Sequence, residues 1–148
     1  MDGARALLPG RRILYRTPLG TRYAAGMAVD PRGSDLKAFL ADDPDEPVVM
    51  VNLLRYAEGG RESYAKYAAA LRDRFLERYG AKVLYAGDGD TALVAEDGQQ
   101  WDAVLLVRYP SRRAFTAMVA DPEYQKITHF RTEALSEAVL QPTRPWPS

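Results

Sequence analysis

The stretch that decides the fold is Pro47–Tyr56, which reads PVVMVNLLRY and is the most hydrophobic run in the chain. Successive side chains of a β-strand point to opposite faces of its sheet, so Val48 and Val49 begin two different faces. Both faces are apolar through the middle of the stretch, which is typical of a strand that is covered on both sides. Pro47–Tyr56 therefore predicts a central strand, and Asn52 is the one polar residue in its middle.

Regular patterns around this strand predict the remaining elements. Apolar residues recur at three- and four-residue steps through Arg61–Tyr79, which predicts the longest helix, with Gly80 directly after its end. Gly87–Asp90 predicts a turn, after which Thr91–Ala95 either extends the preceding strand or forms a short ribbon. The other predicted elements are, in chain order, a helix over Ser34–Leu40, strands over Lys82–Ala86 and Trp101–Tyr109, a helix that Ser111 caps and Asp121–Pro122 interrupts, a second helical piece from Pro122 to Glu133, and a strand over Ala138–Gln141.

The order of these elements predicts a fold class. From the central strand onward it reads strand, helix, strand, strand, helix, strand, which is the split β-α-β pattern of the ferredoxin-like α+β fold. That fold has a four-stranded antiparallel sheet with its helices on one face. The other face is left bare, and both faces of the central strand are apolar. An apolar bare face predicts that two copies form a homodimer through their sheet faces.

Composition narrows the classes of function. The chain has 148 residues, which suits a single domain, and 47% of them are hydrophobic. Its 20 basic residues balance its 20 acidic residues, so no charge excess favours nucleic acid or an anionic membrane. There is no cysteine and only one histidine, which excludes cysteine-based metal sites and sites built from several histidines of one chain. We therefore expect no metal, no cofactor and no nucleic-acid partner.

The chain divides into three parts. Residues 1–26 hold five arginines against a single acid and show no sustained hydrophobic period, so we expect a flexible N-terminal extension. Residues 27–142 form the folded domain, and residues 143–148 form a proline-rich tail. The first segment lacks the apolar block of a secretion signal, and no apolar run approaches the length of a membrane span. We therefore expect a cytoplasmic protein.

Short motifs along the chain carry a family resemblance. They are Pro47–Tyr56, Tyr64–Tyr67, Gly87, Trp101–Asp102, Arg108–Ser111, Asp121–Gln125 and Arg131 with Ala134–Leu135. In this order they resemble the bacterial family called domain of unknown function 1330, of the dimeric α+β barrel superfamily, over roughly Val29–Pro142. The resemblance implies a homodimer whose two sheets form a barrel, with a small pocket in each subunit between sheet and helices. It implies no reaction, because superfamily relatives range from cofactor-free monooxygenases to plain ligand-binding domains.

Asn52 and His129 are the candidate catalytic residues. An amide in the middle of an apolar strand must find hydrogen-bond partners, so Asn52 either orients a ligand in a pocket or is a structural amide. Strand alternation places Asn52 with Met50 and Leu54 but does not decide which face that is. Histidine titrates closest to neutral pH, so His129 is the default general acid or base. Its alternative is a helical histidine without a chemical role.

Three tyrosines and two arginines are the candidate ligand-binding residues beside Asn52. Tyr64 and Tyr67 lie on the helix that is expected to cover the sheet, and Tyr124 lies beyond the Asp-Pro break. Their phenol groups either contact a ligand or pack in the core with the hydroxyl at the rim. Arg108 and Arg131 either anchor an anionic group, such as a carboxylate, or form salt bridges.

Two functions of different classes are consistent with these residues. The first is a small cofactor-independent enzyme that acts on a modest, partly apolar metabolite, with Asn52 polarising a carbonyl and His129 moving a proton. The second is a homodimeric module that binds a small ligand, or a partner, without turnover. Replacement of both residues by alanine without loss of activity would exclude the first function.

Overall fold

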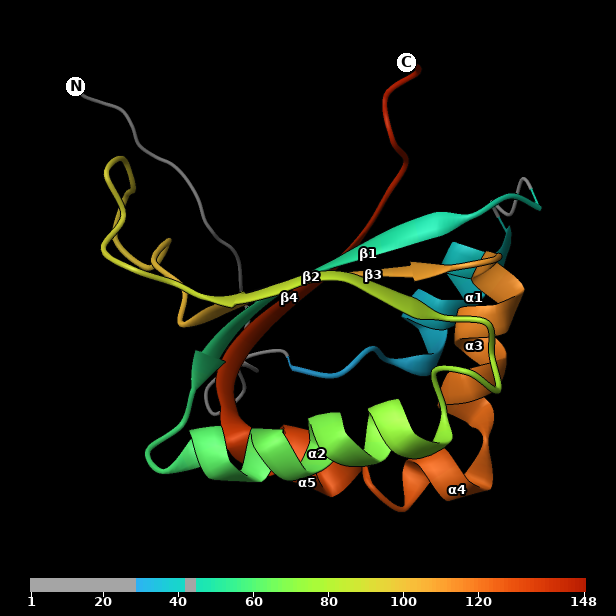
Figure 1. Ribbon diagram of the computed structural model, residues 1–148, viewed down its shortest axis with the longest axis horizontal. Coiled ribbons are helices and arrows are strands. Elements are labelled where there is room, and N and C mark those ends of the chain that lie inside the picture. The colour runs from blue at the N-terminus through green and yellow to red at the C-terminus, as the bar shows by residue number, and fades with distance from the viewer. Residues whose placement is uncertain (1–28, 42–44) are drawn as a thin grey trace.

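The computed structural model describes residues 29–41 and 45–148 (Figure 1). The predicted N-terminal extension, residues 1–26, lies outside the described residues, as do residues 27, 28 and 42–44. In chain order the elements are α1 (Gly33–Ala41), β1 (Val48–Tyr56), α2 (Gly60–Arg74), β2 (Lys82–Asp88), β3 (Ala103–Tyr109), α3 (Arg112–Ala120), α4 (Pro122–Gln125), α5 (Thr128–Ala134) and β4 (Leu135–Thr143).

The predicted central strand forms β1, which lies inside a four-stranded sheet of order β2-β3-β1-β4. β1 pairs with both β3 and β4 in antiparallel register, and β2 pairs antiparallel with the other edge of β3. The run of apolar residues in β1 is therefore flanked by strands on both sides, which satisfies its backbone donors and acceptors. The predicted ferredoxin-like α+β fold is confirmed.

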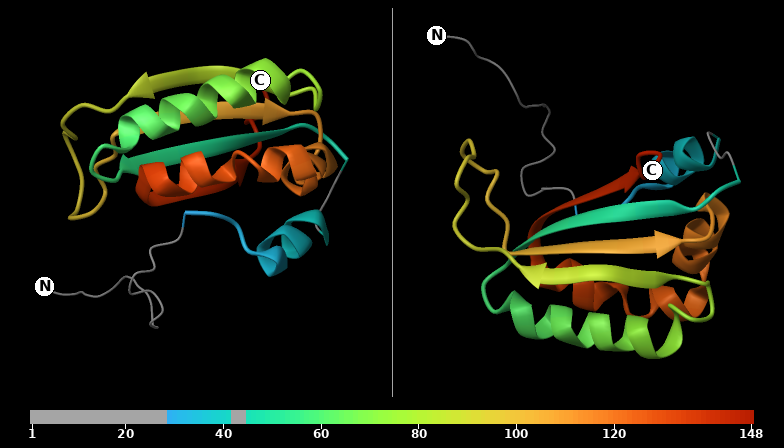
Figure 2. Two further views of the ribbon diagram at one scale, coloured as in Figure 1. Left: turned by 90° about the horizontal axis from the view of Figure 1, so that it is seen from below. Right: turned by 45° about the horizontal axis from the view of Figure 1, so that its top comes forward.

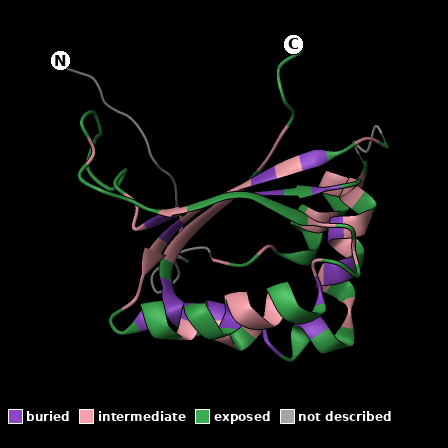
Figure 3. Cartoon of the chain, viewed as in Figure 1, coloured by how far each residue is buried: buried purple, intermediate pink, exposed green. Residues whose placement is uncertain are grey.

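The helices cover one face of the sheet (Figures 1 and 2). α2 and α5 run side by side beneath it, while α3 and α4 lie at one end and α1 packs against α3. The rings of Phe39 in α1 and Phe115 in α3 meet edge to face, with centroids 5.7 Å apart. Figure 3 shows the buried residues concentrated between the sheet and these helices, and the largest fully buried side chains are Leu54, Phe75 and Met118.

The opposite face of the sheet, here called the open face, is covered by no described helix (Figure 2). The pairing registers place a largely apolar set of side chains on it: Val49, Val51 and Leu53 of β1, Val104 and Leu106 of β3, and Val139 of β4. These six residues are half-buried in the single chain. The sequence prediction of one strand with two apolar faces thus corresponds to one face under helices and one open face.

The loop of residues 89–102, here called the arm, links β2 to β3 and extends away from the helices (Figure 1). Arg55 of the open face fixes its base, because its guanidinium donates to the carbonyl oxygens of Gly98, at 2.7 Å, and Gln100. The same guanidinium lies 4.5 Å from the centroid of the Trp101 ring. The tip of the arm carries Leu93 and Val94, which are 99% and 95% exposed.

The long helix ends earlier than its apolar period predicts. α2 stops at Arg74 instead of Tyr79, and the chain then continues in turns as far as Gly80. Gly80 has φ +68°, and hydrogen bonds run from its N–H to Glu77 and from Ala81 N–H to Leu76. Gly80 therefore ends this turn segment, whereas Phe75 is the C-cap of α2, so the prediction that Gly80 directly follows the helix is wrong.

Several other boundaries differ from their predictions. β2 runs two residues farther, through the predicted turn at Gly87, and residues 91–95 form no strand.

The second helical piece is two helices, α4 and α5, because the chain turns at Lys126 and Ile127 between them. β4 is longer than predicted and includes Pro142, which an edge strand tolerates because one side of it needs no donor. The predicted cap at Ser111 is confirmed, since its side chain accepts from the N–H of Ala114, and Asp121 at the predicted break caps α4 by accepting from the N–H of Glu123.

Candidate functional site

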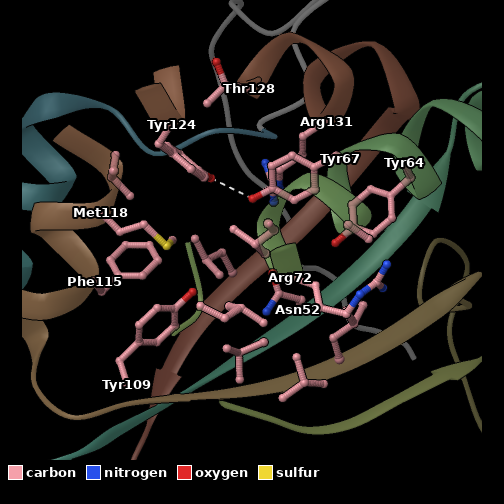
Figure 4. A pocket seen from close by; sticks show the side chains of 18 of the residues that line it. Asn52, Tyr64, Tyr67, Arg72, Tyr109, Phe115, Met118, Tyr124, Thr128 and Arg131 are labelled. Carbon is pink, nitrogen blue, oxygen red and sulfur yellow. Dashed lines mark hydrogen bonds between the residues drawn. The ribbon is translucent and has the colours of Figure 1, made fainter. Parts of the chain in front are cut away.

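A cavity of about 460 Å³ lies between the helix-facing side of the sheet and helices α2, α3, α4 and α5 (Figure 4). This volume is within the range of small-molecule sites in proteins. Most of its wall is apolar, formed by side chains such as Leu71, Leu105, Val107, Phe115 and Met118. The polar residues that line it are Asp30, Asn52, Tyr64, Tyr67, Arg72, Tyr109, Tyr124, Gln125, Thr128 and Arg131.

Four tyrosines supply most of the polar groups that are buried at the cavity. Tyr64 and Tyr67 are one helical turn apart on α2, Tyr124 is on α4 and Tyr109 ends β3. The hydroxyl oxygens of Tyr67 and Tyr124 lie 2.6 Å apart and share a hydrogen bond, drawn in Figure 4. This bond therefore joins α2 to α4 inside the cavity wall, across 57 positions of the chain.

These phenols stay neutral over the physiological range. Burial raises the pKa of Tyr64 to about 12. Burial also raises the pKa values of Tyr67, Tyr109 and Tyr124 above the ordinary 10 of a phenol. A neutral phenol donates and accepts hydrogen bonds but does not act as a base near pH 7.

Asn52 lies on the helix-facing side of β1 and lines the cavity, which answers the question that strand alternation left open. The register sets it beside Leu105 of β3 and Leu140 of β4, two apolar residues that also line the cavity. Its amide nitrogen donates to the carbonyl oxygen of Met50 over a long 3.4 Å. Most of the hydrogen-bonding capacity of this amide is therefore directed at the cavity.

Arg131 is the buried charge of the site, with a side chain only 6% exposed. Nη1 donates to the carbonyl oxygen of Val29 and to Oδ1 of Asp30, the latter at 2.9 Å. Oδ2 of the same carboxylate accepts a 2.8 Å hydrogen bond from Thr132. Nη2 is buried and has no hydrogen-bond partner among the described residues. Arg131 thus holds the segment before α1 against α5 and keeps one nitrogen unused.

The structure brings together five of the seven residues that sequence reasoning singled out. Asn52, Tyr64, Tyr67, Tyr124 and Arg131 all line the cavity.

The other two predicted residues lie away from the cavity. His129 is exposed on α5, with its ring centroid 4.1 Å from that of Phe130, and it does not line the cavity. His129 is exposed whereas Arg131, two residues later on the same helix, is buried, so the two side chains lie on different sides of α5. Arg108 is exposed and projects from the open face, since it neighbours Val107, which lines the cavity on the other side. Geometry therefore gives no support to a role for either residue at this cavity.

Sequence reasoning missed Tyr109 and Asp30. Tyr109 shares the strand parity of Leu105 and Val107, so alternation along β3 could have found it. Asp30 carries no such signal, because its contact with Arg131 spans 101 positions of the chain. Within the part of the chain that the structure describes, no three His, Cys, Asp or Glu residues gather in a way that could hold a metal ion.

The fold and its cavity define a ferredoxin-like α+β protein with room for a small molecule. Residues 56–141 match the family model described as Domain of unknown function (DUF1330), and the chain belongs to that family. The resemblance seen in the motifs is therefore confirmed. No curated protein matches the chain. None of the described helices has the length and apolar character that crossing a membrane requires.

Solved structures agree with this assignment. A protein of unknown function from Rhodopseudomonas palustris, RPA0582, is 29% identical, with a TM-score of 0.75 over 82% of this chain and 99% of that one. A putative antibiotic biosynthesis monooxygenase from Bacteroides thetaiotaomicron is 20% identical, with a TM-score of 0.51 over 68% of this chain and 90% of that one. A dimeric ferredoxin-like protein of unknown function from Jannaschia sp. CCS1 is 12% identical, with a TM-score of 0.52 over 67% of this chain and 99% of that one. The last two likenesses show the fold alone.

Proposed function

We propose that this protein binds a small, partly apolar molecule in the cavity between sheet and helices. The observation that carries the proposal is the 460 Å³ cavity itself, with an apolar wall and several buried polar groups. Binding sites for small molecules have this composition, because the apolar wall supplies affinity and a few polar groups fix orientation. Asn52 and the Tyr67–Tyr124 pair are the groups that would orient the ligand.

Proton-transfer chemistry has less support than binding. Acid–base catalysis at neutral pH works best with a group that titrates near that pH. The exposed His129 does not line the cavity, and burial raises the pKa of the lining tyrosine Tyr64 to about 12. The groups at the cavity are thus suited to hydrogen bonding with a ligand. We therefore place ligand binding ahead of the enzymatic alternative.

A substitution that fills the cavity tests the proposal. Ala68 lines the cavity from α2, whereas Ala65 is exposed on the same helix and does not line it. The probes are monocyclic aromatic and short-chain compounds that carry a hydroxyl, amide, carbonyl or carboxylate group, and the readout is the melting temperature. A ligand that binds only the folded state raises that temperature. We expect Ala68→Phe to abolish the stabilisation and Ala65→Phe to retain it.

Two results would contradict the proposal. The first is a probe set that stabilises neither the wild type nor Ala65→Phe at millimolar concentration. The second is equal stabilisation of Ala68→Phe and wild type, which would place the binding site outside the cavity. Conversion of a stabilising probe into a new compound, followed by mass spectrometry, would instead restore the enzymatic alternative.

We also infer that two copies associate through their open faces. The support is the apolar centre of that face, with Val51, Leu53 and Leu106 left accessible in the single chain. Leu93 and Val94 of the arm are exposed and add apolar surface. The Jannaschia protein of the same fold is described as dimeric. Light scattering after size exclusion at micromolar concentration is expected to give twice the chain mass, and a clean monomer would contradict the inference. A cytoplasmic location stays a prediction.

A further inference from the structure

We propose that the ligand of the cavity carries a carboxylate and that the guanidinium of Arg131 binds it. This inference rests on the proposed function and names the chemical class of its ligand. Arg131 is nine-tenths buried, lines the cavity, and has a nitrogen, Nη2, without a partner among the described residues. A planar guanidinium carries five N–H donors and a permanent charge, and carboxylate oxygens are the acceptors that match it best.

The internal partners of Arg131 leave this capacity unused. Val29 and Asp30 both accept from Nη1, and neither N–H group of Nη2 makes a hydrogen bond with a described residue. A buried donor on a charged group that makes no hydrogen bond is costly to stability. An acceptor on a ligand would remove that cost, which makes Nη2 an anchoring point that the rest of the fold does not use.

The charges around the cavity favour an anion. Asp30 is the one acid among its described lining residues, against the two cations Arg72 and Arg131. The Asp30 side chain is 42% exposed and divides its oxygens between Arg131 and Thr132. The carboxylate of this pair is therefore much more exposed to solvent than the guanidinium, although Asp30 also lines the cavity. The enclosed charge is felt throughout the cavity, because it lowers the pKa values of Tyr64, Tyr67, Tyr109 and Tyr124 against the larger effect of burial, which raises them.

The rest of the site selects among anions. A phosphate carries close to two negative charges and is typically bound by several cations or by backbone N–H groups. Here a single enclosed guanidinium stands against an apolar wall that includes Leu71, Leu105 and Phe115. Neutral phenols such as Tyr67 supply further donors without further charge. A monoanionic carboxylate on a mostly hydrocarbon skeleton matches this combination best.

The experiment compares each acid with its own neutral amide. The probes are phenylacetate with phenylacetamide, 4-methylbenzoate with 4-methylbenzamide, and hexanoate with hexanamide, titrated by calorimetry at pH 7.5. For the wild type we expect at least one acid to bind tenfold or more tightly than its amide. Arg131→Met keeps most of the side-chain volume and removes the charge, and we expect it to bring acid and amide within twofold of each other.

Two further variants make the result specific to Arg131. Arg74→Met makes the same substitution at an exposed residue of α2 that does not line the cavity, and the preference for the acid is expected to persist. Asp30→Asn removes the carboxylate that competes for Arg131, so the preference is expected to rise threefold or more. This last variant retains Arg131 and tests the proposal even if Arg131→Met does not fold.

The possible failures are distinguishable. Equal binding of acids and amides to the wild type overturns the carboxylate assignment and leaves the proposed function standing. The same holds if Arg74→Met abolishes the preference or Asp30→Asn lowers it. Absence of binding by every acid and every amide overturns both proposals.

Discussion

Tyr67 and Tyr124 place their hydroxyl oxygens 2.6 Å apart in an apolar interior, where each is the described hydrogen-bond partner of the other. The two rings also meet edge to face, with centroids 6.2 Å apart. A buried hydroxyl without a partner would cost more than the bond itself contributes, so the pairing keeps both phenols inside the cavity wall. Because these buried phenols are neutral in the folded protein, its stability depends on pH in the alkaline range.

We expect the protein to lose stability as pH rises above 10. Burial raises the pKa of Tyr64 to about 12, against 10 for an unperturbed phenol. Between these values the unfolded chain releases a proton that the folded chain retains, so the free energy of unfolding falls by about 1.4 kcal/mol per pH unit for this tyrosine. Below pH 10 both states are protonated and this contribution is fully present. Urea unfolding from pH 9 to 11.5, at fixed protein concentration, measures the slope.

Matched variants assign the slope to the buried phenol. Tyr64→Phe is expected to reduce the alkaline slope by about 1.4 kcal/mol per pH unit, one tyrosine's share. Tyr85→Phe, at a tyrosine that is 55% exposed on β2, is expected to leave the slope unchanged. An unchanged slope in Tyr64→Phe would show that Tyr64 does not retain its proton in the folded state.

For single residues, the sequence predicted cavity-lining positions where strand or helix periodicity determines which face a side chain occupies. Asn52 and Arg131 were singled out as polar residues within apolar patterns, and both line the cavity. The chemical reactivity of a side chain predicts its place in the cavity less well than the face of the helix on which it lies. His129 was chosen for its reactivity, and it is exposed. Asp30 could not be found, because no local pattern relates it to a residue that lies 101 positions away.

At the scale of elements, the start of α2 approaches the backbone of Ala134 closely. A Cβ on Gly60 would lie 2.0 Å from the carbonyl oxygen of Ala134, at the junction of α5 and β4. The same oxygen accepts a 2.8 Å hydrogen bond from the N–H of Ala57. Only a residue without a side chain fits there, since the atom it would meet is backbone and is itself held in place.

Gly60→Ala is therefore expected to destabilise the protein by about 1–3 kcal/mol, the usual cost of forcing extra volume into a packed site. Gly33→Ala is the matched control, because a Cβ at Gly33 in α1 meets nothing within 4 Å. Alanine is the better helix former, so that variant is expected to be neutral or stabilised by up to about 1 kcal/mol. Chemical denaturation of both variants compares them, and equal stabilities would show that α2 can shift away from Ala134 at no cost.

Element types were more predictable than element ends. The apolar period of the long helix continues past Arg74, yet hydrogen bonding becomes irregular at Phe75, where both Phe75 and Leu76 donate to Leu71. β2 continues through Gly87 because its partner β3 extends the pairing as far as Asp88. Such ends depend on a neighbouring element, whereas the type of each element depends on its own periodicity.

At the scale of the whole molecule, the two faces of the sheet differ in what they contact. One side holds the cavity, and the other is the open face. Leu106 lies near the middle of the open face, opposite Val51 across the β1–β3 pairing. A charge there costs little in a single chain, where it can reach water, but is costly inside an apolar interface.

Leu106→Asp is accordingly expected to convert the inferred dimer into a folded monomer. Ala65→Asp introduces the same charge on the exposed side of α2 and is expected to leave the mass unchanged. Light scattering gives the mass, and circular dichroism checks that the fold is kept. A dimer that survives Leu106→Asp would place the interface elsewhere than on the open face.

β1 is synthesised well before β4, the strand that pairs with one of its edges. Val49 of β1 accepts a hydrogen bond from Thr143 of β4, a residue 94 positions later in the chain. Translation proceeds at roughly 5–20 residues per second, so the most hydrophobic run of the protein waits on the order of 5–20 s for its last neighbour. During that time its apolar faces and unpaired edges are exposed to whatever the nascent chain meets. Shielding of this strand during translation, more than the stability of the finished sheet, would then limit the yield of folded protein in the cell.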